Sequence, residues 1–146
     1  MSPHWVRALA ELLIEEFKVD KAVSIYITND LKIKDLNRSF RNIDSPTDVL
    51  SFELSDEHYL GEIVISYQTA KKSAANDGHS LRKEIKKLIA HGFIHLLGLD
   101  HEVPSQRDEF FSLEKRALEV LCFDLGSIES RFCNFARKRV HASDIP

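Results

Sequence analysis

The chain has 146 residues, with 20 Lys and Arg against 23 Asp and Glu, and its formal net charge is −3. This length is typical of a single domain, large enough to fold without a disulfide or a structural metal. Hydrophobic residues at 43% and charged residues at 29% exclude a disordered chain. The mildly negative charge excludes a uniformly basic nucleic-acid binder, so a nucleic acid would have to bind a local patch.

The cysteines and the apolar stretches predict where the protein works. Two cysteines, Cys122 and Cys133, are too few for a disulfide scaffold and favour a reducing compartment. The first residues lack the basic and apolar regions of a secretion signal. The longest mostly apolar stretch, residues 88–99, is shorter than the about 20 residues of a membrane span. We therefore expect a cytoplasmic protein with no membrane partner.

Hydrophobic periodicity divides the chain into strands and helices. Runs rich in β-branched residues predict strands over 22–28, 48–52 and 60–66. Apolar residues at helical spacing predict helices over 5–17, 31–40, 67–75 and 81–97, and from Pro104 or Ser105 to about Leu121. Capping and stop signals frame these helices at Asn29-Asp30, Gly78, Ser80 and Gly98. Residues 124–146 lack a clear pattern and are typical of a flexible tail, frayed or dependent on a partner.

The apolar positions of these elements predict the core and the fold class. The helix over 31–40 offers Leu31, Ile33, Leu36 and Phe40 as apolar positions, and the last helix offers Phe110, Phe111, Leu113, Leu118 and Leu121. Because the strands cluster in the first half, we expect a single α+β domain over residues 1–146 with a mixed sheet, rather than a doubly wound parallel fold.

The segment 91–101 carries the main chemical signal. His91 and His95 are four residues apart, so on a helix both side chains project from one face. Gly98 ends that helix and places His101 to supply a third imidazole. Three neutral imidazoles suit zinc, and such a site leaves a fourth position open for water, as in catalytic zinc sites. The remaining histidines lack this context and are interpreted as surface or satisfied residues: His4, His58, His79 and His141.

The histidine spacing is also that of a long zinc-protease motif, except at one position. Those proteases carry a glutamate directly after the first histidine, where it acts as the general base. The corresponding residue here is Gly92. Because a glycine takes no proton, the sequence argues against peptide hydrolysis by that mechanism.

Three blocks of the chain resemble the YbeY family of bacterial endoribonucleases. The first is His-Gly-Phe-Ile-His-Leu-Leu-Gly-Leu-Asp-His at 91–101. The second runs from Leu36 to Phe52 and contains Asn-Arg-Ser-Phe-Arg and Pro-Thr-Asp-Val-Leu-Ser-Phe. The third is Leu-Gly-Glu-Ile-Val-Ile-Ser at 60–66, where the family more often has Asp in place of Glu62. Together they cover roughly residues 20–121.

The resemblance implies a zinc-dependent, single-strand-specific endoribonuclease. It implies a role in rRNA maturation at the 16S rRNA 3′ end and in ribosome quality control, with rRNA and the ribosome or its small subunit as partners. It implies one zinc ion on His91, His95 and His101, and a catalytic role for Arg41. The implied fold is a mixed four-stranded sheet packed with about five helices, one of which carries the first two ligands.

The charge that develops during phosphodiester cleavage is consistent with these roles. A metal ion and a guanidinium both stabilise negative charge on phosphoryl oxygens, although Arg41 can also be read as a solvated helix-end cation. Asp48 and Asp100 are either carboxylates that orient a ligand or residues that stabilise turns. No general base is identified. Glu62 and Asp48 are candidates, and the nucleophile is either hydroxide supplied by the metal or an RNA 2′-hydroxyl.

A basic stretch leads into the histidine motif. Its candidate RNA contacts are Lys71, Lys72, Arg82 and Lys83. Residues 48–62, in contrast, contain five acids and no Lys or Arg. The two stretches predict either a polarised surface with a basic rim or merely solvated helix faces.

Two other functions remain open from the sequence. A metalloprotease-like or other metal-dependent hydrolase would use the same three histidines. A non-catalytic, ribosome-associated zinc protein would need a fourth protein ligand, for which Cys122, Cys133 and Asp100 are the candidates.

Overall fold

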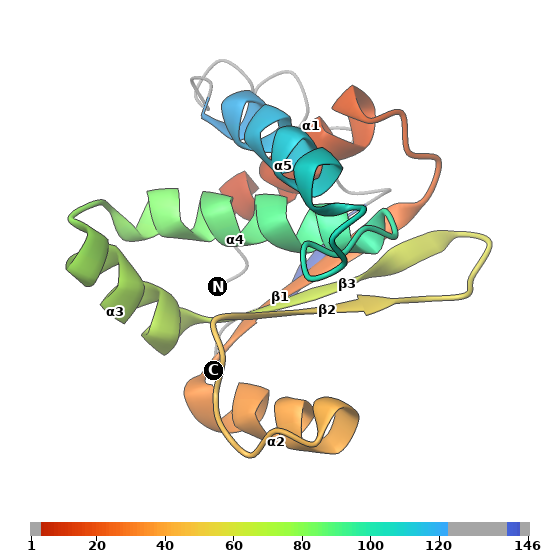
Figure 1. The fold of residues 1–146 in the computed structure, drawn as a ribbon. Coiled ribbons are helices and arrows are strands. Elements are labelled where there is room, and N and C mark those ends of the chain that lie inside the picture. The colour runs from red at the N-terminus through yellow and green to blue at the C-terminus, as the bar shows by residue number, and fades with distance from the viewer. Residues whose placement is uncertain (1–3, 123–139, 144–146) are drawn as a thin grey trace.

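The computed structural model describes residues 4–122 and 140–143, and it contains both helices and strands (Figure 1). In chain order the elements are α1 (His4–Glu16), β1 (Ala22–Thr28), α2 (Asp30–Arg41), β2 (Val49–Glu53), β3 (Tyr59–Ser66), α3 (Tyr67–Asp77), α4 (Leu81–Leu96), α5 (Arg107–Leu121) and β4 (Val140–Ser143). None of the described helices combines the length and the hydropathy that a membrane span requires.

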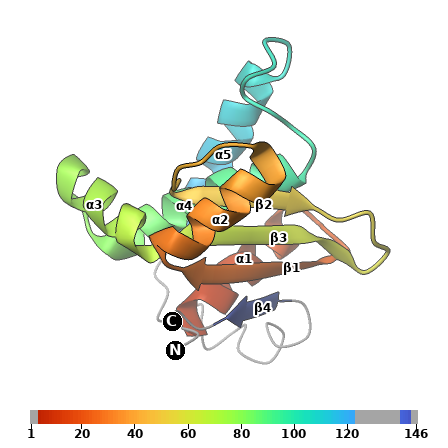
Figure 2. The same ribbon diagram turned by 90° about the horizontal axis from the view of Figure 1, so that it is seen from below.

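The sheet has the strand order β2-β3-β1-β4 and mixes parallel with antiparallel pairs. Strand β1 runs parallel to both β3 and β4, whereas β2 is antiparallel to β3. Helix α2 covers one face of the sheet, while α1 and α4 cover the other, with α5 lying outside them (Figures 1 and 2). The predicted α+β class and the mixed sheet are thus confirmed.

The edge strand that pairs with β1 comes from a part of the chain for which no strand was predicted. Up to residue 122 the chain contributes three strands, which match the three predicted runs within one residue at each end. Strand β4 comes instead from the predicted tail, where Val140–Ser143 pairs with β1. A strand of four residues is too short to leave a hydrophobic pattern that can be recognised in the sequence, which explains the error. The rest of the tail lies outside the described residues.

The predicted capping residues hold the helix ends. The Asn29 side chain accepts a hydrogen bond from the Lys32 backbone N–H (2.8 Å), and the Ser80 hydroxyl accepts one from Lys83 (3.1 Å). Gly78 adopts a left-handed φ of 71° at the end of α3. Gly98, two residues beyond the end of α4, has a φ of 94°. These local signals therefore fix where α4 begins and where the chain turns after it.

Three of the predicted apolar positions are exposed. Leu31 and Phe40 on α2 are 72% and 68% exposed, and Phe111 on α5 is 46% exposed. On α2 the core contact is made by Ile33, and Leu31 lies on the opposite side of the helix, two residues away. On α5 the adjacent Phe110 faces the core in place of Phe111.

Two glycines allow α4 to lie very close to the sheet. A Cβ at Gly92 would meet Ser51 Oγ at 2.9 Å and Ile63 Cγ2 at 3.0 Å. A Cβ at Gly61, on β3, would meet Leu96 Cδ2 at 2.5 Å and would collide with the backbone oxygen of Phe52. The Ser51 hydroxyl also donates to the Gly92 carbonyl (3.2 Å), which ties α4 to β2. Both glycines are therefore required by packing.

Replacing Gly61 by Ala should destabilise the fold by about 3 kcal/mol or more, at the upper end for overpacking, because the opposing Phe52 oxygen belongs to the sheet backbone. The control is Gly78→Ala, which meets no atom within 4 Å and should cost about 1 kcal/mol for its left-handed backbone. Urea denaturation measures both free energies of unfolding. An equal loss in the two variants would contradict the packing argument.

Candidate metal centre

The three histidines of the motif converge at the end of α4. His91 and His95 project from the same side of α4, one turn apart, and the left-handed Gly98 lets the following chain return with His101. One ring nitrogen from each residue lies within 4.8 Å of the others. The Nε2 atoms of His91 and His95 are 3.2 Å apart. The structure therefore groups the three predicted ligands; we call them the histidine triad.

The hydrogen bonds of the triad fix which nitrogens are free. His91 Nδ1 lies 2.5 Å from a carboxylate oxygen of Glu114, and His95 Nδ1 lies 3.0 Å from the Leu99 carbonyl oxygen. Both partners are acceptors, so both Nδ1 atoms carry hydrogen. When both rings are neutral, their two Nε2 atoms direct lone pairs towards each other. This arrangement is unfavourable unless a cation lies between the two atoms.

The triad fits a zinc ion by this donor arrangement. Zinc–nitrogen bonds of 2.0–2.1 Å at tetrahedral angles separate two ligand nitrogens by about 3.3 Å. The His91–His95 separation is 3.2 Å. Burial, together with the nearby His91 and His101, lowers the pKa of His95 below its ordinary value, so this ring is neutral at physiological pH. His101 Nδ1 is buried and has no hydrogen-bond partner among the described residues.

Helix α5 supplies two contacts that the sequence analysis missed. The Phe110 ring packs against all three histidine rings, with centroid distances of 5.1, 4.8 and 5.1 Å to His91, His95 and His101. Glu114, one turn further along α5, holds His91 Nδ1. The i, i+4 spacing of these two residues was a usable signal once Phe110 was assigned to the core.

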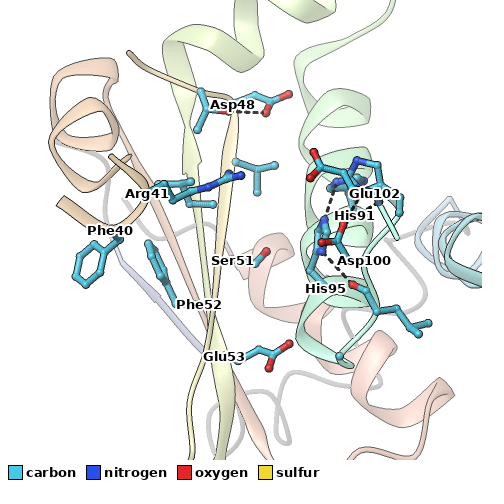
Figure 3. A pocket seen from close by; sticks show the side chains of 16 residues that line it. Phe40, Arg41, Asp48, Ser51, Phe52, Glu53, His91, His95, Asp100 and Glu102 are labelled. Carbon is cyan, nitrogen blue, oxygen red and sulfur yellow. Dashed lines mark hydrogen bonds and ion pairs between the residues drawn. The ribbon is translucent and has the colours of Figure 1, made fainter. Parts of the chain in front are cut away.

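The triad opens into a cleft of about 630 Å³ between α4 and the end of α2 (Figure 3). Its other walls are residues 47–53, which include strand β2, and residues 98–102. Arg41, the last residue of α2, directs its guanidinium across the cleft, and it forms no ion pair within the described part of the chain. The structure thus places the predicted catalytic cation and the triad in one cleft.

Carboxylates dominate the remaining charge of this cleft. Asp48, Glu53, Asp100 and Glu102 all line it, with Arg41 as its one Lys or Arg. Asp100 Oδ1 lies 3.8 Å from His101 Nδ1, beyond hydrogen-bond distance, and accepts a hydrogen bond from the Glu102 backbone N–H. Among the described residues, the closest interaction of the Asp100 carboxylate is therefore within its own turn.

Gly92 does not face the triad. Its missing side chain would point at β2 and β3, so this position has no room for a glutamate like that of the zinc proteases. Of the two candidate bases, Asp48 lines the cleft and Glu62 does not.

The basic residues predicted to contact RNA lie apart from this cleft. Lys71 and Lys72 are on α3, Arg82 and Lys83 begin α4, and none of the four lines the cleft. The exposed Arg82 stacks its guanidinium on the Trp5 ring, 4.6 Å from the ring centroid. Their role in RNA binding remains a prediction.

A second group of potential metal ligands already interacts with other side chains of the protein. Asp77, His79 and Glu84 lie together at the start of α4. His79 Nε2 is 2.5 Å from Glu84, and Lys87 Nζ lies 3.8 Å from Asp77 and 3.7 Å from Glu84. His79 is therefore a satisfied residue, as predicted.

Comparisons with known proteins show which family this chain resembles. The family model described as "Endoribonuclease YbeY" matches residues 2–122. An "Endoribonuclease YbeY" of Aquifex aeolicus is 43% identical over 118 residues, which covers 77% of this chain and 79% of that protein. One of Acholeplasma laidlawii is 39% identical over 112 residues, covering 75% and 82%. A solution structure from Thermotoga maritima superposes with a TM-score of 0.60 at 30% identity and covers 91% of this chain and 85% of the other.

Removing the Glu114 carboxylate should weaken zinc binding by about 10- to 100-fold, because His91 would lose the group that orients its ring. The test is zinc affinity of Glu114→Ala by competition with a chromophoric chelator. Glu119→Ala, an exposed glutamate on the same helix, is the control and should bind zinc like the wild type. Equal affinities for all three proteins would contradict the assigned role of Glu114.

Proposed function

The chain belongs to the YbeY family of endoribonucleases, and from this premise we propose that it is a zinc-dependent enzyme that cleaves single-stranded RNA. The proposed role is maturation of the 16S rRNA 3′ end and ribosome quality control, in the cytoplasm and in association with the ribosome or its small subunit. The observation that carries the proposal is that the histidine triad lines one cleft together with Arg41, which has no ion-pair partner among the described residues.

The triad is the proposed site of one zinc ion, held by His91, His95 and His101. Zinc bound there would neutralise charge on the scissile phosphate and act as a Lewis acid. The protein orients two of the ligands through Glu114 and the Leu99 carbonyl, so little rearrangement is needed when the metal binds.

Arg41 is the proposed phosphate contact. A guanidinium offers two parallel N–H donors that match two phosphoryl oxygens, and it stays charged throughout the reaction. Because no carboxylate pairs with it among the described residues, its donors are available to the substrate. With four acids on the walls, the cleft repels a phosphate unless Arg41 and the metal site oppose them.

A metalloprotease-like function is the second candidate, because one observation favours it. The outer edge of β2 has no strand partner among the described residues and lines the cleft, so an extended peptide would find free backbone groups there. However, Gly92 stands where zinc proteases carry their general-base glutamate, and packing requires a glycine at this position. We therefore rank RNA cleavage first, and a panel of peptide and RNA substrates separates the two.

A purely structural zinc site is less well supported. It needs a fourth protein ligand, yet the group that includes the triad contains only three candidate ligands within the described residues. Cys122 is exposed at the end of α5, Cys133 lies outside the described residues, and Asp100 is engaged in its own turn.

Replacing His91 by Ala should abolish zinc binding and RNA cleavage together, because two imidazoles remain. Cleavage of a labelled single-stranded RNA and metal content are measured on the same preparations. Chelation of the wild type should stop cleavage, and added zinc should restore it. RNA cleavage by metal-free protein at the wild-type rate would contradict the proposal.

Replacing Arg41 by Ala should lower the cleavage rate by about 10²- to 10³-fold while zinc content is unchanged, because a group that stabilises charge in the transition state is removed. Arg38→Ala is the matched control, since Arg38 lies on the same helix, pairs with Asp35 (3.1 Å) and does not line the cleft. Similar rates for the two variants would remove Arg41 from the site.

A further inference from the structure

A second hollow, of about 420 Å³, adjoins the cleft at the histidine triad. Both depressions are lined by Asp48, Val49 and His91, so these three residues form the border between them. The second hollow continues past His91 between α4 and α5, where Lys87 and Lys115 contribute to its walls. A chain-like substrate whose reacting group sits at the triad would therefore extend into both depressions.

Each depression has an exposed phenylalanine. Phe40 lines the cleft and is 68% exposed, and Phe111 lines the second hollow and is 46% exposed. Each ring is held by another aromatic ring: Phe40 by Phe52 at 5.2 Å and 63°, and Phe111 by Phe110 at 5.8 Å and 89°. Exposing such rings to water is unfavourable, so two of them flanking one site indicate a ligand surface.

The charges of the two depressions show what kind of contact must supply affinity for a polyanion. Arg41 is the one Lys or Arg of the cleft and faces four carboxylates, and the lysines of the second hollow face Asp48, Glu84 and Glu114. Phosphate contacts alone would therefore hold an RNA strand weakly. Stacking of bases on aromatic rings adds affinity that does not depend on net charge.

Each exposed ring has a cation close to it in the sequence that lines the same depression. Arg41 directly follows Phe40, and Figure 3 shows the Arg41 side chain directed into the cleft and the Phe40 ring beside Phe52, across β2 from the histidines. Lys115 follows Phe111 by four residues, on the same side of α5, and forms no ion pair among the described residues. Each ring is thus accompanied by one cation, which matches the alternation of base and phosphate.

We propose that Phe40 and Phe111 are stacking platforms for two unpaired bases of the RNA, one on each side of the scissile phosphate. This inference rests on the proposed function, since it takes RNA to be the substrate. Bases within a duplex already stack on each other and do not offer free faces to a protein ring. The two platforms would therefore select single-stranded RNA by a physical mechanism that is separate from the metal chemistry.

The test is binding of a fluorescent single-stranded RNA oligonucleotide to the zinc-loaded, full-length protein, followed by anisotropy. Phe40→Leu and Phe111→Leu should each weaken binding by about 5- to 100-fold, the effect of losing one stacked base. Phe40→Trp and Phe111→Trp should retain it, because a larger ring still stacks. Leu31→Ala is the control, since Leu31 is as exposed as Phe40 and lines neither depression. Thermal melting of every variant verifies folding.

Abasic substitutions in the RNA make the test specific for stacking. Removing the base that faces a ring should weaken binding to the wild type and have no further effect on the matching Leu variant. Unchanged affinity of both Leu variants overturns the proposal. The proposal is also overturned if the Leu variants lose affinity for duplex and single-stranded RNA equally. It is overturned as well if they lose binding only to isolated ribosomal subunits, because that result would indicate a protein-docking surface.

Cleavage is measured separately, so that the two proposals can fail independently. Wild-type protein that binds RNA through both rings without cutting it would support the platforms and contradict the proposed activity. If the wild type cuts RNA and both Leu variants cut it with the KM of the wild type, the activity is supported and the stacking platforms are overturned. No detectable RNA binding by the wild type would overturn both.

Discussion

The close contact between α4 and the sheet is the constraint on which the site depends. Gly92 faces Ser51 and Ile63 at distances that exclude a side chain, and the Ser51 hydroxyl bonds to its carbonyl. With 3.6 residues per turn, His91 and His95 then lie about 60–100° around the helix from Gly92. This rotation puts both rings beside the sheet at its β2 edge, where the cleft opens, rather than under the sheet or in solvent.

The triad also depends on α5, which connects it to the N-terminal helix. Phe110 and Glu114 contact the histidines from α5. Arg116, two residues further along this helix, bonds to Glu16 at 2.8 Å and stacks on Phe17 at 4.6 Å. Phe17 in turn packs against Phe93 of α4, with ring centroids 5.6 Å apart. Helices α1, α4 and α5 therefore form one packed unit around the histidine triad, and binding of a metal there would be thermodynamically linked to the stability of this unit.

The sequence predicted the features that are encoded locally. Helix caps, the left-handed Gly78 and the i, i+4 pair of His91 and His95 depend on residues within a turn of each other, so a single sequence suffices to find them. The Glu114 contact was missed because it joins residues 23 apart through packing of two helices. The contact between Arg82 and Trp5 had no local signal for the same reason, since it joins residues far apart in the sequence.

Adjacent residues and distant pairings were the other sources of error. Phe110 and Phe111 are equally apolar, and only the orientation of α5 decides which one enters the core. Strand β4 pairs Val140 with Val23, more than a hundred residues away, and such a pairing has no local signal.

The outer edge of β2, which has no strand partner among the described residues, has a consequence for self-association. If two copies paired antiparallel along this edge in the register that sets Asp48 opposite Glu53, these carboxylates would face each other at both ends of the paired segment. The same carboxylates that make the cleft unfavourable for a polyanion would thus repel a second copy and keep the edge free.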